Sequence, residues 1–289
     1  MSSLAIVRPE AGINPPALLG VTGKSPATTE SYRRAARDWI TWAKGRPLTA
    51  HLFAAWIEAE RRRGTSTAKL RLELYGGKAA IMQAATTAGL AARELAGLKT
   101  ALDSIRAPKL AKVPDIEVVD GHERARITAA LSPRMALIAR FLYATAARIS
   151  EAINVRQADV KLDGEHSARV KLHGKGDKER TVRIPLDLLC EINAEFKSMR
   201  RVFLFESRPG RAYCRNHITR KISAAALQEI GRRIGSHDLR HSRATDLFAK
   251  SGNLKGIAEL LGHSDVSVTA KYYVRTSLTE NDLWDKEEI

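Results

Sequence analysis

The sequence has only two cysteines, few aromatic residues and no long apolar run, and each shortage excludes a class of protein. Cys190 and Cys214 form no disulfide framework and fit no metal-ligand spacing, which favours a reduced, cytoplasmic setting. No apolar run approaches the ~20 residues that span a bilayer, and the N-terminus lacks the basic-then-apolar layout of a secretory signal. Hydrophobic residues still make up 44% of the chain, which is ordinary for a helix-rich protein with real cores.

Acidic residues are outnumbered by basic ones. The chain has 48 Lys and Arg against 32 Asp and Glu, a net charge of +16 and a pI of about 10.1. Such an excess favours a polyanionic partner, either nucleic acid or an anionic membrane. Because no membrane segment is evident, DNA or RNA is the expected partner. The length of 289 residues predicts one or two domains.

The first third of the chain is expected to form a flexible arm and then a helical module. Residues 1–24 carry several prolines and glycines without a sustained period, which predicts the arm. Residues 25–106 contain four amphipathic segments, which begin near Thr28, Thr49, Ser66 and Leu90. Gly76 and Gly77 are expected to interrupt the third helix or bend it.

This helical module is also strongly basic. Residues 25–112 hold 16 Lys and Arg against 7 Asp and Glu, an excess large enough to bind DNA phosphates. Arginines lie opposite the apolar face of the first helix and end the second; the candidates are Arg33, Arg34, Arg37, Arg61, Arg62 and Arg63. A basic helix end also suits the helix dipole while fully solvated, so phosphate contact and a solvated surface both remain open.

Residues 107–119 contain two prolines and break the helical period, which predicts a linker to a second domain over residues 120–276. This domain should begin with two helices, over residues 124–131 and 133–143. Residues 168–172 and 181–185 alternate apolar and polar, which predicts a hairpin around the glycine-bounded turn 174–179. The predicted fold is therefore mainly α with a small antiparallel β-sheet. Residues 277–289 form an acidic tail.

Two residues of the second domain suit the chemistry of a phosphate group. His237 and Arg240 stand three apart, so on a helix they share one face with their Cβ atoms ~5–6 Å apart. A cation and an imidazole so arranged can grip a phosphate and move a proton beside it. A zinc site at His237, His241 and His263 is the competing interpretation. It is disfavoured because the sequence offers neither a His-Glu-x-x-His pair nor nearby cysteines.

Other candidates for this chemistry have ordinary explanations when each is considered separately. Arg148 precedes Glu151 by three residues, as in many surface ion pairs. Lys175 lies between two glycines at the tip of the expected hairpin, where a lysine commonly only aids solubility. Tyr272 and Tyr273 follow His263 after nine and ten residues in a segment that can form a short helix.

Taken together, the order Arg148, Lys175, His237-x-x-Arg240, Leu261-Gly262-His263 and Tyr272 resembles the tyrosine recombinase (phage integrase) family. The similarity covers residues 120–273 and, more loosely, the helical module, which would correspond to the family's DNA-clamping domain. The resemblance implies a site-specific DNA recombinase that needs no metal or nucleotide cofactor. It also implies a 3′-phosphotyrosyl intermediate, two protomers on each duplex of double-stranded DNA and a homo-tetramer at the synapse.

The resemblance also implies a role for each candidate residue. Arg148 and Arg240 would hold the phosphate, Glu151 would orient Arg148, and Lys175 would protonate the leaving 5′-oxygen. His237 would accept a proton or donate to the phosphate, His263 would donate to a phosphate oxygen, and Tyr272 would be the nucleophile, with Tyr273 as the adjacent alternative. His241 is expected to be a packed histidine.

Three questions remain open at this level. Arginines in the stretch after the hairpin could face the DNA major groove or lie on a solvated helix; these are Arg211, Arg215 and Arg220. The acidic tail is expected to dock on protein, either its own domain or a neighbouring protomer. The alternative functions are a type IB topoisomerase-like DNA relaxer and a catalytically inactive DNA-binding regulator. The expected location is the cytoplasm, in association with the nucleoid.

Overall fold

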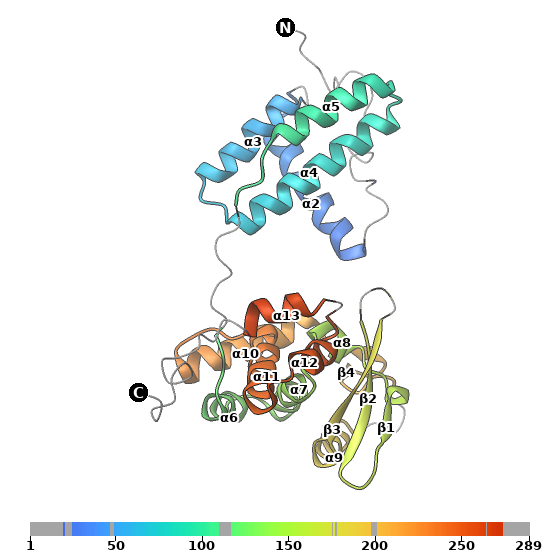
Figure 1. The fold of residues 1–289 in the computed structure, drawn as a ribbon, viewed down its shortest axis with the longest axis vertical. Coiled ribbons are helices and arrows are strands. Elements are labelled where there is room, and N and C mark those ends of the chain that lie inside the picture. Colours follow the sequence, from blue (N-terminus) through green and yellow to red (C-terminus); the bar gives the residue numbers. More distant parts are fainter. Residues whose placement is uncertain are drawn as a thin grey trace, which may run out of the picture. The chain divides into compact units, whose positions relative to one another are not determined.

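A computed structural model describes residues 20, 25–46, 49–109, 117–174, 176, 178–197, 201–263 and 265–273, without the side chains of residues 27, 268 and 271–273. The chain divides into two compact units, with the boundary between Pro114 and Asp115 (Figure 1). This boundary falls within the range 107–119 expected as a linker. The expected arm, the tail 277–289 and Lys175 lie outside the described residues, apart from Gly20 in the arm.

The N-terminal unit consists of α2 (Pro26–Ala43), α3 (Ala50–Arg62), α4 (Thr67–Thr87) and α5 (Ala92–Ser104). Side-chain hydroxyls of Ser25, Thr49 and Ser66 cap the first three helices by accepting hydrogen bonds from backbone N–H groups. The first helix therefore begins slightly earlier than expected, because Ser25 caps it and proline is tolerated in a first turn. Trp39, Phe53 and Trp56 form the centre of its core.

The expected interruption of the third helix is wrong. The helix α4 runs unbroken through Gly76 and Gly77, and both glycines are buried. A Cβ atom on Gly76 would lie 3.0 Å from the Cβ of Ala35 in α2, and one on Gly77 would lie 2.3 Å from the Phe53 ring. The glycines therefore allow two neighbouring helices to approach α4 closely, and this packing outweighs their low helix propensity.

The second unit is mainly helical with small antiparallel sheets, which confirms the predicted fold class. Its helices are α6 (Gly121–Ala129), α7 (Pro133–Thr145), α8 (Ile149–Ile153), η2 (Gln157–Asp159), α9 (Leu186–Glu195), α10 (Arg215–Ile230), α11 (Ser236–Ser251), α12 (Leu254–Leu261) and α13 (Val266–Tyr273). Its strands are β1 (Val160–Leu162), β2 (Ser167–His173), β3 (Glu179–Pro185), β4 (Glu206–Arg208) and β5 (Arg211–Ala212). Among the described residues, no helix has both the length and the apolar character needed to cross a membrane.

The expected hairpin is confirmed as β2 and β3, which pair in antiparallel register from Ser167–Pro185 to His173–Glu179. Inward side chains such as Val170 and Val182 are buried, and α9 contacts both strands (Figure 1). The short strand β1 and the ribbon β4–β5 were not expected. Their strands are only three and two residues long, too short for an alternating pattern to be recognised.

The core of the second unit joins the hairpin to the helices. Phe205 packs edge-on against Phe141 of α7 and Phe196, with ring centroids 5.1 and 5.5 Å apart. The central helix α7 also contacts α11, α9 and β3. The end of α7, the hairpin and α11 are therefore fixed relative to one another by buried apolar contacts, and this frame carries the polar residues described next.

The close packing at Gly77 gives a testable prediction. Gly77→Ala should lower the free energy of unfolding by about 1–3 kcal/mol, because the new methyl group collides with the Phe53 ring. Gly97→Ala in α5 is the matched control, since a Cβ there meets nothing within 4 Å, and it should raise stability by up to ~1 kcal/mol. Urea unfolding followed by tryptophan fluorescence measures both. Equal stability of the two variants would contradict the packing argument.

Candidate active site

The turn between α7 and α8 presents Arg148. The helix α7 ends at Ala146, which adopts a left-handed conformation with φ of 48° and is completely buried. Arg148 then caps the N-terminus of α8, and its backbone N–H donates to Glu151 Oε2 over 2.8 Å. The Arg148 side chain is 38% exposed, so its guanidinium group is held by the turn and still accessible to a ligand.

Glu151 is a buried carboxylate that accepts four hydrogen bonds. Arg148 supplies its backbone N–H and its Nη1, the latter over 2.9 Å. Arg180 of β3 supplies Nη1 over 3.0 Å and Nη2 over 2.7 Å, which is a forked pair. Burial would raise the pKa of Glu151, but the hydrogen bonds from Arg180 and Arg148 lower it to about 2. The carboxylate is therefore ionised at any physiological pH and orients Arg148.

Arg240 is buried near the ends of two helices. It is only 3% exposed, and it donates from Nη1 to Ala146 O over 2.7 Å and from Nη2 to Leu261 O over 2.6 Å. These oxygens lie at the C-terminal ends of α7 and α12, where the helix dipoles are negative. The fold thus stabilises the buried cation through main-chain carbonyl groups at two helix ends.

His263 lies directly after Gly262, whose φ of 63° ends α12. Its Nδ1 is 2.8 Å from the Oγ1 of Thr269 in α13, and its Nε2 is 3.3 Å from Arg240 Nη2. Burial and the charges of Arg240 and Arg148 lower the pKa of His263 to about 4. The ring is therefore neutral. Because a guanidinium group can only donate, Nε2 accepts from Arg240 and Nδ1 carries the proton.

A cleft of about 880 Å³ joins these groups to the hairpin turn. Its lining includes Arg148, Gly174, Gly176, Lys178 and His263. Lys175 lies outside the described residues, but both of its glycine neighbours line this cleft. Gly174 closes the hairpin by donating to Lys178 O over 2.7 Å, and a Cβ atom on it would lie 3.4 Å from Glu151 Oε1. The glycine therefore lets the turn pass close to the carboxylate.

The other sequence candidates of this domain lie on α11 and α13. His237 lies in the first turn of α11, and partial burial of the ring, followed by the charges of Arg240 and Arg148, lowers its pKa. His241 is half-buried, and burial followed by His237 and Arg240 lowers its pKa. Tyr272 and Tyr273 are the last residues of α13, one turn beyond Thr269. Their side chains lie outside the described part of the chain.

No metal centre is evident among the described residues, in which no three His, Cys, Asp or Glu side chains gather as metal ligands. Cys190 and Cys214 are both exposed and unpaired with each other.

The predicted DNA-contact arginines are at the surface, and several have ion-pair partners. Arg61 and Arg63 pair with Glu58 and Glu60 over 2.9 and 2.8 Å, and Arg37 pairs with Glu30. Arg62 lies 3.6 Å from Glu58. Arg34, Arg211, Arg215 and Arg220 are exposed, and Arg33 is half-buried. Exposed pairs contribute only about 0–1 kcal/mol, so DNA phosphates could replace these partners at little cost.

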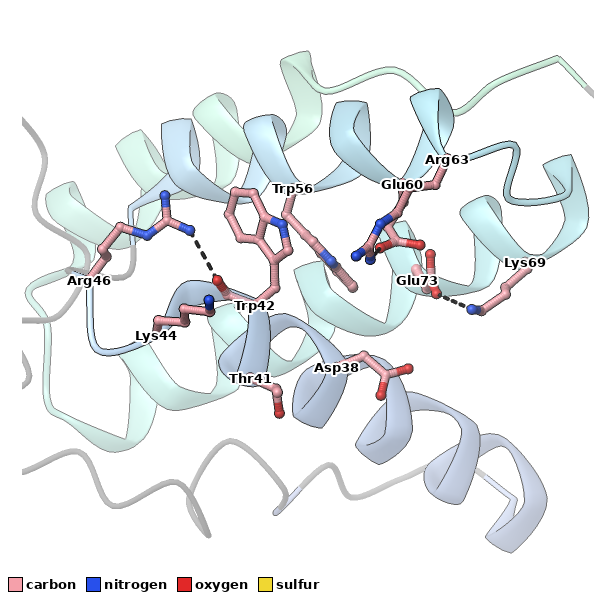
Figure 2. A pocket seen from close by; sticks show the side chains of 10 residues that line it. All are labelled: Asp38, Thr41, Trp42, Lys44, Arg46, Trp56, Glu60, Arg63, Lys69 and Glu73. Atoms are coloured by element: carbon pink, nitrogen blue, oxygen red, sulfur yellow. Dashed lines mark hydrogen bonds and ion pairs between the residues drawn. The ribbon is translucent and has the colours of Figure 1, made fainter.

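A second cavity, of about 710 Å³, lies within the N-terminal unit (Figure 2). Glu60 and Glu73 line it, and both carboxylates are buried. Lys69 lies 3.3 Å from Glu73, whose pKa is raised by burial, and Figure 2 shows this pair at one side of Trp56. Four basic residues, including Arg63 and Lys69, also line this cavity, which belongs to the N-terminal unit and not to the unit that holds the cleft described above.

The sequence did not suggest two side chains of the site's hydrogen-bond network, Arg180 and Thr269. The alternation of β3 could have indicated Arg180, because it lies two and four residues before Val182 and Ile184, whose side chains are on the buried face of the strand. An arginine at an inward position of an alternating strand must have a partner. Its partner, Glu151, lies 29 residues earlier in the chain, so sequence spacing could not identify it.

Comparisons with known proteins identify the family of the chain. Residues 117–279 match the model of the phage integrase family. The chain is 31% identical over 281 residues to the tyrosine recombinase XerA of Thermococcus kodakarensis, covering 93% of this chain and 91% of that protein. It is 33% identical over 275 residues to the tyrosine recombinase XerC of Bradyrhizobium diazoefficiens, covering 86% and 83%.

The fold is similar to a lambda integrase dimer bound to a COC′ core site, with a TM-score of 0.67, 18% identity and coverage of 92% of this chain and 76% of that one. The chain therefore belongs to the phage integrase family. It is a tyrosine-type enzyme that recombines DNA at specific sites.

The neutral state of His263 can be measured. In the DNA-free protein its ring should titrate with a pKa of about 4, and Arg148→Gln should raise this value because it removes one of the charges that oppose protonation. Nuclear magnetic resonance of the ring signals across pH 3–8 follows the titration. A midpoint near the ordinary 6.5 in the unmodified protein would contradict the described environment.

Proposed function

We propose that this recombinase cleaves DNA by attack of the Tyr272 phenol oxygen on a scissile phosphodiester. A bond forms between this oxygen and phosphorus, and the bond from phosphorus to the 5′-oxygen breaks. The products are a 3′-phosphotyrosyl link and a free 5′-hydroxyl. The 5′-hydroxyl of a partner duplex then attacks the link and releases the tyrosine. One phosphoester replaces another, so the reaction as proposed balances without nucleotide hydrolysis.

The observation that carries this proposal is that Arg148 and His263 line one cleft, with Arg240 Nη2 3.3 Å from His263 Nε2 and Thr269 Oγ1 of α13 2.8 Å from His263 Nδ1. A phenol with a pKa of ~10 is only ~0.1% ionised at neutral pH, and forming the phenolate costs about 4 kcal/mol. Fixed cations around the phosphate offset this cost and stabilise the additional negative charge of the transition state. Arg240 is suited to this task because hydrogen bonds to two main-chain carbonyl groups hold its guanidinium group in a fixed position.

Arg148 and Lys175 would act on the two kinds of phosphate oxygen. The Arg148 guanidinium group, oriented by Glu151, would bind the non-bridging oxygens with its planar fork. Lys175, in the turn whose glycines line the cleft, would protonate the leaving 5′-oxygen. A positioned general acid typically contributes ~10²–10⁴-fold to the rate.

The two histidines would begin the reaction in their neutral forms. His237 can accept the phenol proton, because the neighbouring arginines lower its pKa. His263 accepts from Arg240 in the DNA-free protein, so the proposed donation to a phosphate oxygen requires it to gain a proton at Nε2. An arriving phosphate anion favours this step, since a nearby negative charge raises a histidine pKa.

The partner is double-stranded DNA, and exchange between two sites requires two protomers on each duplex and a homo-tetramer at the synapse. Similar structures support this stoichiometry, because lambda integrase is described as a dimer on a core site and a tetramer on a Holliday junction. The acidic tail 277–289 carries Leu283, Trp284 and Ile289, and we assign it to a contact between protomers. The DNA substrate makes the nucleoid the site of action.

A type IB topoisomerase-like relaxer would share the cleavage chemistry but rejoin the same strand. An inactive DNA-binding regulator would need neither the nucleophile nor a buried Glu151 that accepts four hydrogen bonds. Recombinant products distinguish the proposed function from the first alternative, and a covalent protein–DNA adduct distinguishes it from the second.

DNA contacts by the second unit can be tested through salt dependence. Arg215→Gln together with Arg220→Gln should weaken binding to duplex DNA, and the slope of log affinity against log salt should become shallower by about 0.9 for each lost phosphate contact. Arg183→Gln is a control, since this exposed arginine pairs with Asp163 over 2.6 Å. An unchanged slope in the double variant would assign both arginines to a solvated surface.

The nucleophile can be tested with a nicked suicide duplex containing the recombination site, which is first mapped by capturing adducts on DNA that flanks the gene. Tyr272→Phe should bind this duplex normally but form no adduct, because the attacking oxygen is absent. Tyr273→Phe is the matched control and should form the adduct. The reverse pattern would move the nucleophile to Tyr273, and adducts in both variants would refute a tyrosine nucleophile at either position.

A further inference from the structure

Arg180 connects three parts of the site and has no role in the chemistry proposed above. Its Nη1 and Nη2 form the forked pair with Glu151, which orients Arg148. Its Nε donates over 2.7 Å to Leu260 O in the last turn of α12, three residues before His263. Arg180 itself is the second residue of β3, the strand that follows the turn containing Lys175. The Arg180 side chain therefore hydrogen-bonds to Glu151 and to the last turn of α12, and its backbone belongs to the strand that follows the Lys175 turn.

The surroundings of Arg180 are shaped for this contact. A Cβ atom on Gly262 would lie 3.1 Å from Arg180 Nη1, so the glycine that ends α12 also provides space for the guanidinium group. The Arg180 side chain is only 12% exposed, whereas Arg148, bound to the same carboxylate, is 38% exposed. Both side chains line the cleft, but Nε, Nη1 and Nη2 of Arg180 all donate to protein oxygen atoms, whereas Arg148 is the more exposed of the two and can reach a ligand.

Lysine could not reproduce this arrangement. A forked pair with a carboxylate and a simultaneous bond to a carbonyl oxygen 80 residues away require the rigid, planar set of donors that only arginine has. The hydrogen bonds also compensate for burial of Glu151, which is 3% exposed and would otherwise carry an unfavourable buried charge.

We infer that Arg180 is a positioning residue for DNA cleavage: it fixes Glu151, and through it Arg148, against the end of α12 that presents His263. This inference rests on the proposed function, because it concerns the rate of the same cleavage step. It assigns no contact between Arg180 and DNA.

The inference has a consequence for the pH dependence of cleavage. The charged side chains that face Glu151 among the described residues are Arg148 from its own helix and Arg180 from β3, and Gly174 covers it from β2. Arg180 is the first of the groups that hold the pKa of Glu151 down against the effect of burial. Without Arg180 the pKa of Glu151 rises, so protonation releases Arg148 as the pH falls. With Arg180 present, Glu151 stays ionised down to about pH 2.

The experiment measures adduct formation on the nicked suicide duplex, DNA affinity and thermal unfolding for the unmodified protein and for each variant. Arg180→Gln should form the adduct roughly 10²-fold more slowly, the loss that a displacement of about 1 Å in a catalytic group produces. Its DNA affinity and salt slope should be unchanged, and its rate should decline further at acidic pH. The matched control is Arg183→Gln on the same strand, whose exposed side chain pairs with Asp163; it should behave like the unmodified protein.

A double variant tests whether Arg180 acts through Glu151. Arg180→Gln combined with Glu151→Gln should be no slower than the slower single variant, and the additional acidic decline should disappear. Fully multiplicative losses in the double variant would overturn the proposed route through Glu151.

Further outcomes would also overturn the inference. A rate in Arg180→Gln equal to that in Arg183→Gln would show that the network is dispensable. A salt slope shallower by about 0.9 would mean that Arg180 contacts a phosphate directly. If Arg180→Gln does not fold, Arg180→Lys decides, because it keeps the charge but not the fork; an unchanged rate there refutes the inference. Failure of the unmodified protein to form any adduct would instead refute the proposed function, and this inference with it.

Discussion

The burial of positive charge beside a cleft that would accept a phosphate in the proposed reaction is the constraint on which the site depends. Arg240 has almost no contact with water, and it donates hydrogen bonds to main-chain carbonyl oxygens and to a neutral imidazole. Carboxylates in place of these carbonyl groups would neutralise more of the charge. The C-terminal ends of α7 and α12 supply partial negative charge instead, and their positions are fixed by the apolar core.

Arg148 meets the same constraint differently. Its partner is a full carboxylate, Glu151, but this carboxylate is shared with Arg180. Two cations and one anion leave a net positive charge, so Arg148 can be oriented by an ion pair and still attract a phosphate. The protein thus uses the helix ends for the buried arginine and a shared carboxylate for the exposed one.

Much of this arrangement could be predicted from the sequence because it rests on local patterns. Alternating residues predicted β2 and β3, and hydroxyl residues before apolar periods predicted the starts of α3 and α4. The ordered set of Arg, His and Tyr residues predicted the family. The errors concern contacts between distant segments. Gly76 and Gly77 were expected to break a helix because their low propensity is visible in the sequence, whereas the neighbours that need their small size, Ala35 and Phe53, are not adjacent to them. Arg180 was missed for the same reason.

The imidazole of His263 forms two hydrogen bonds, and only one of them can persist when the ring gains a proton. Its Nδ1–H donates to Thr269 in the neutral ring and would still donate in the protonated ring, whereas Nε2 is an acceptor in the first state and a donor in the second. Nε2 of the ring can therefore change from acceptor to donor while the hydrogen bond from Nδ1 to Thr269 of α13 is kept. A proton arriving at Nε2 would alter which groups the cleft attracts without requiring any rearrangement of the helix that ends in the two tyrosines.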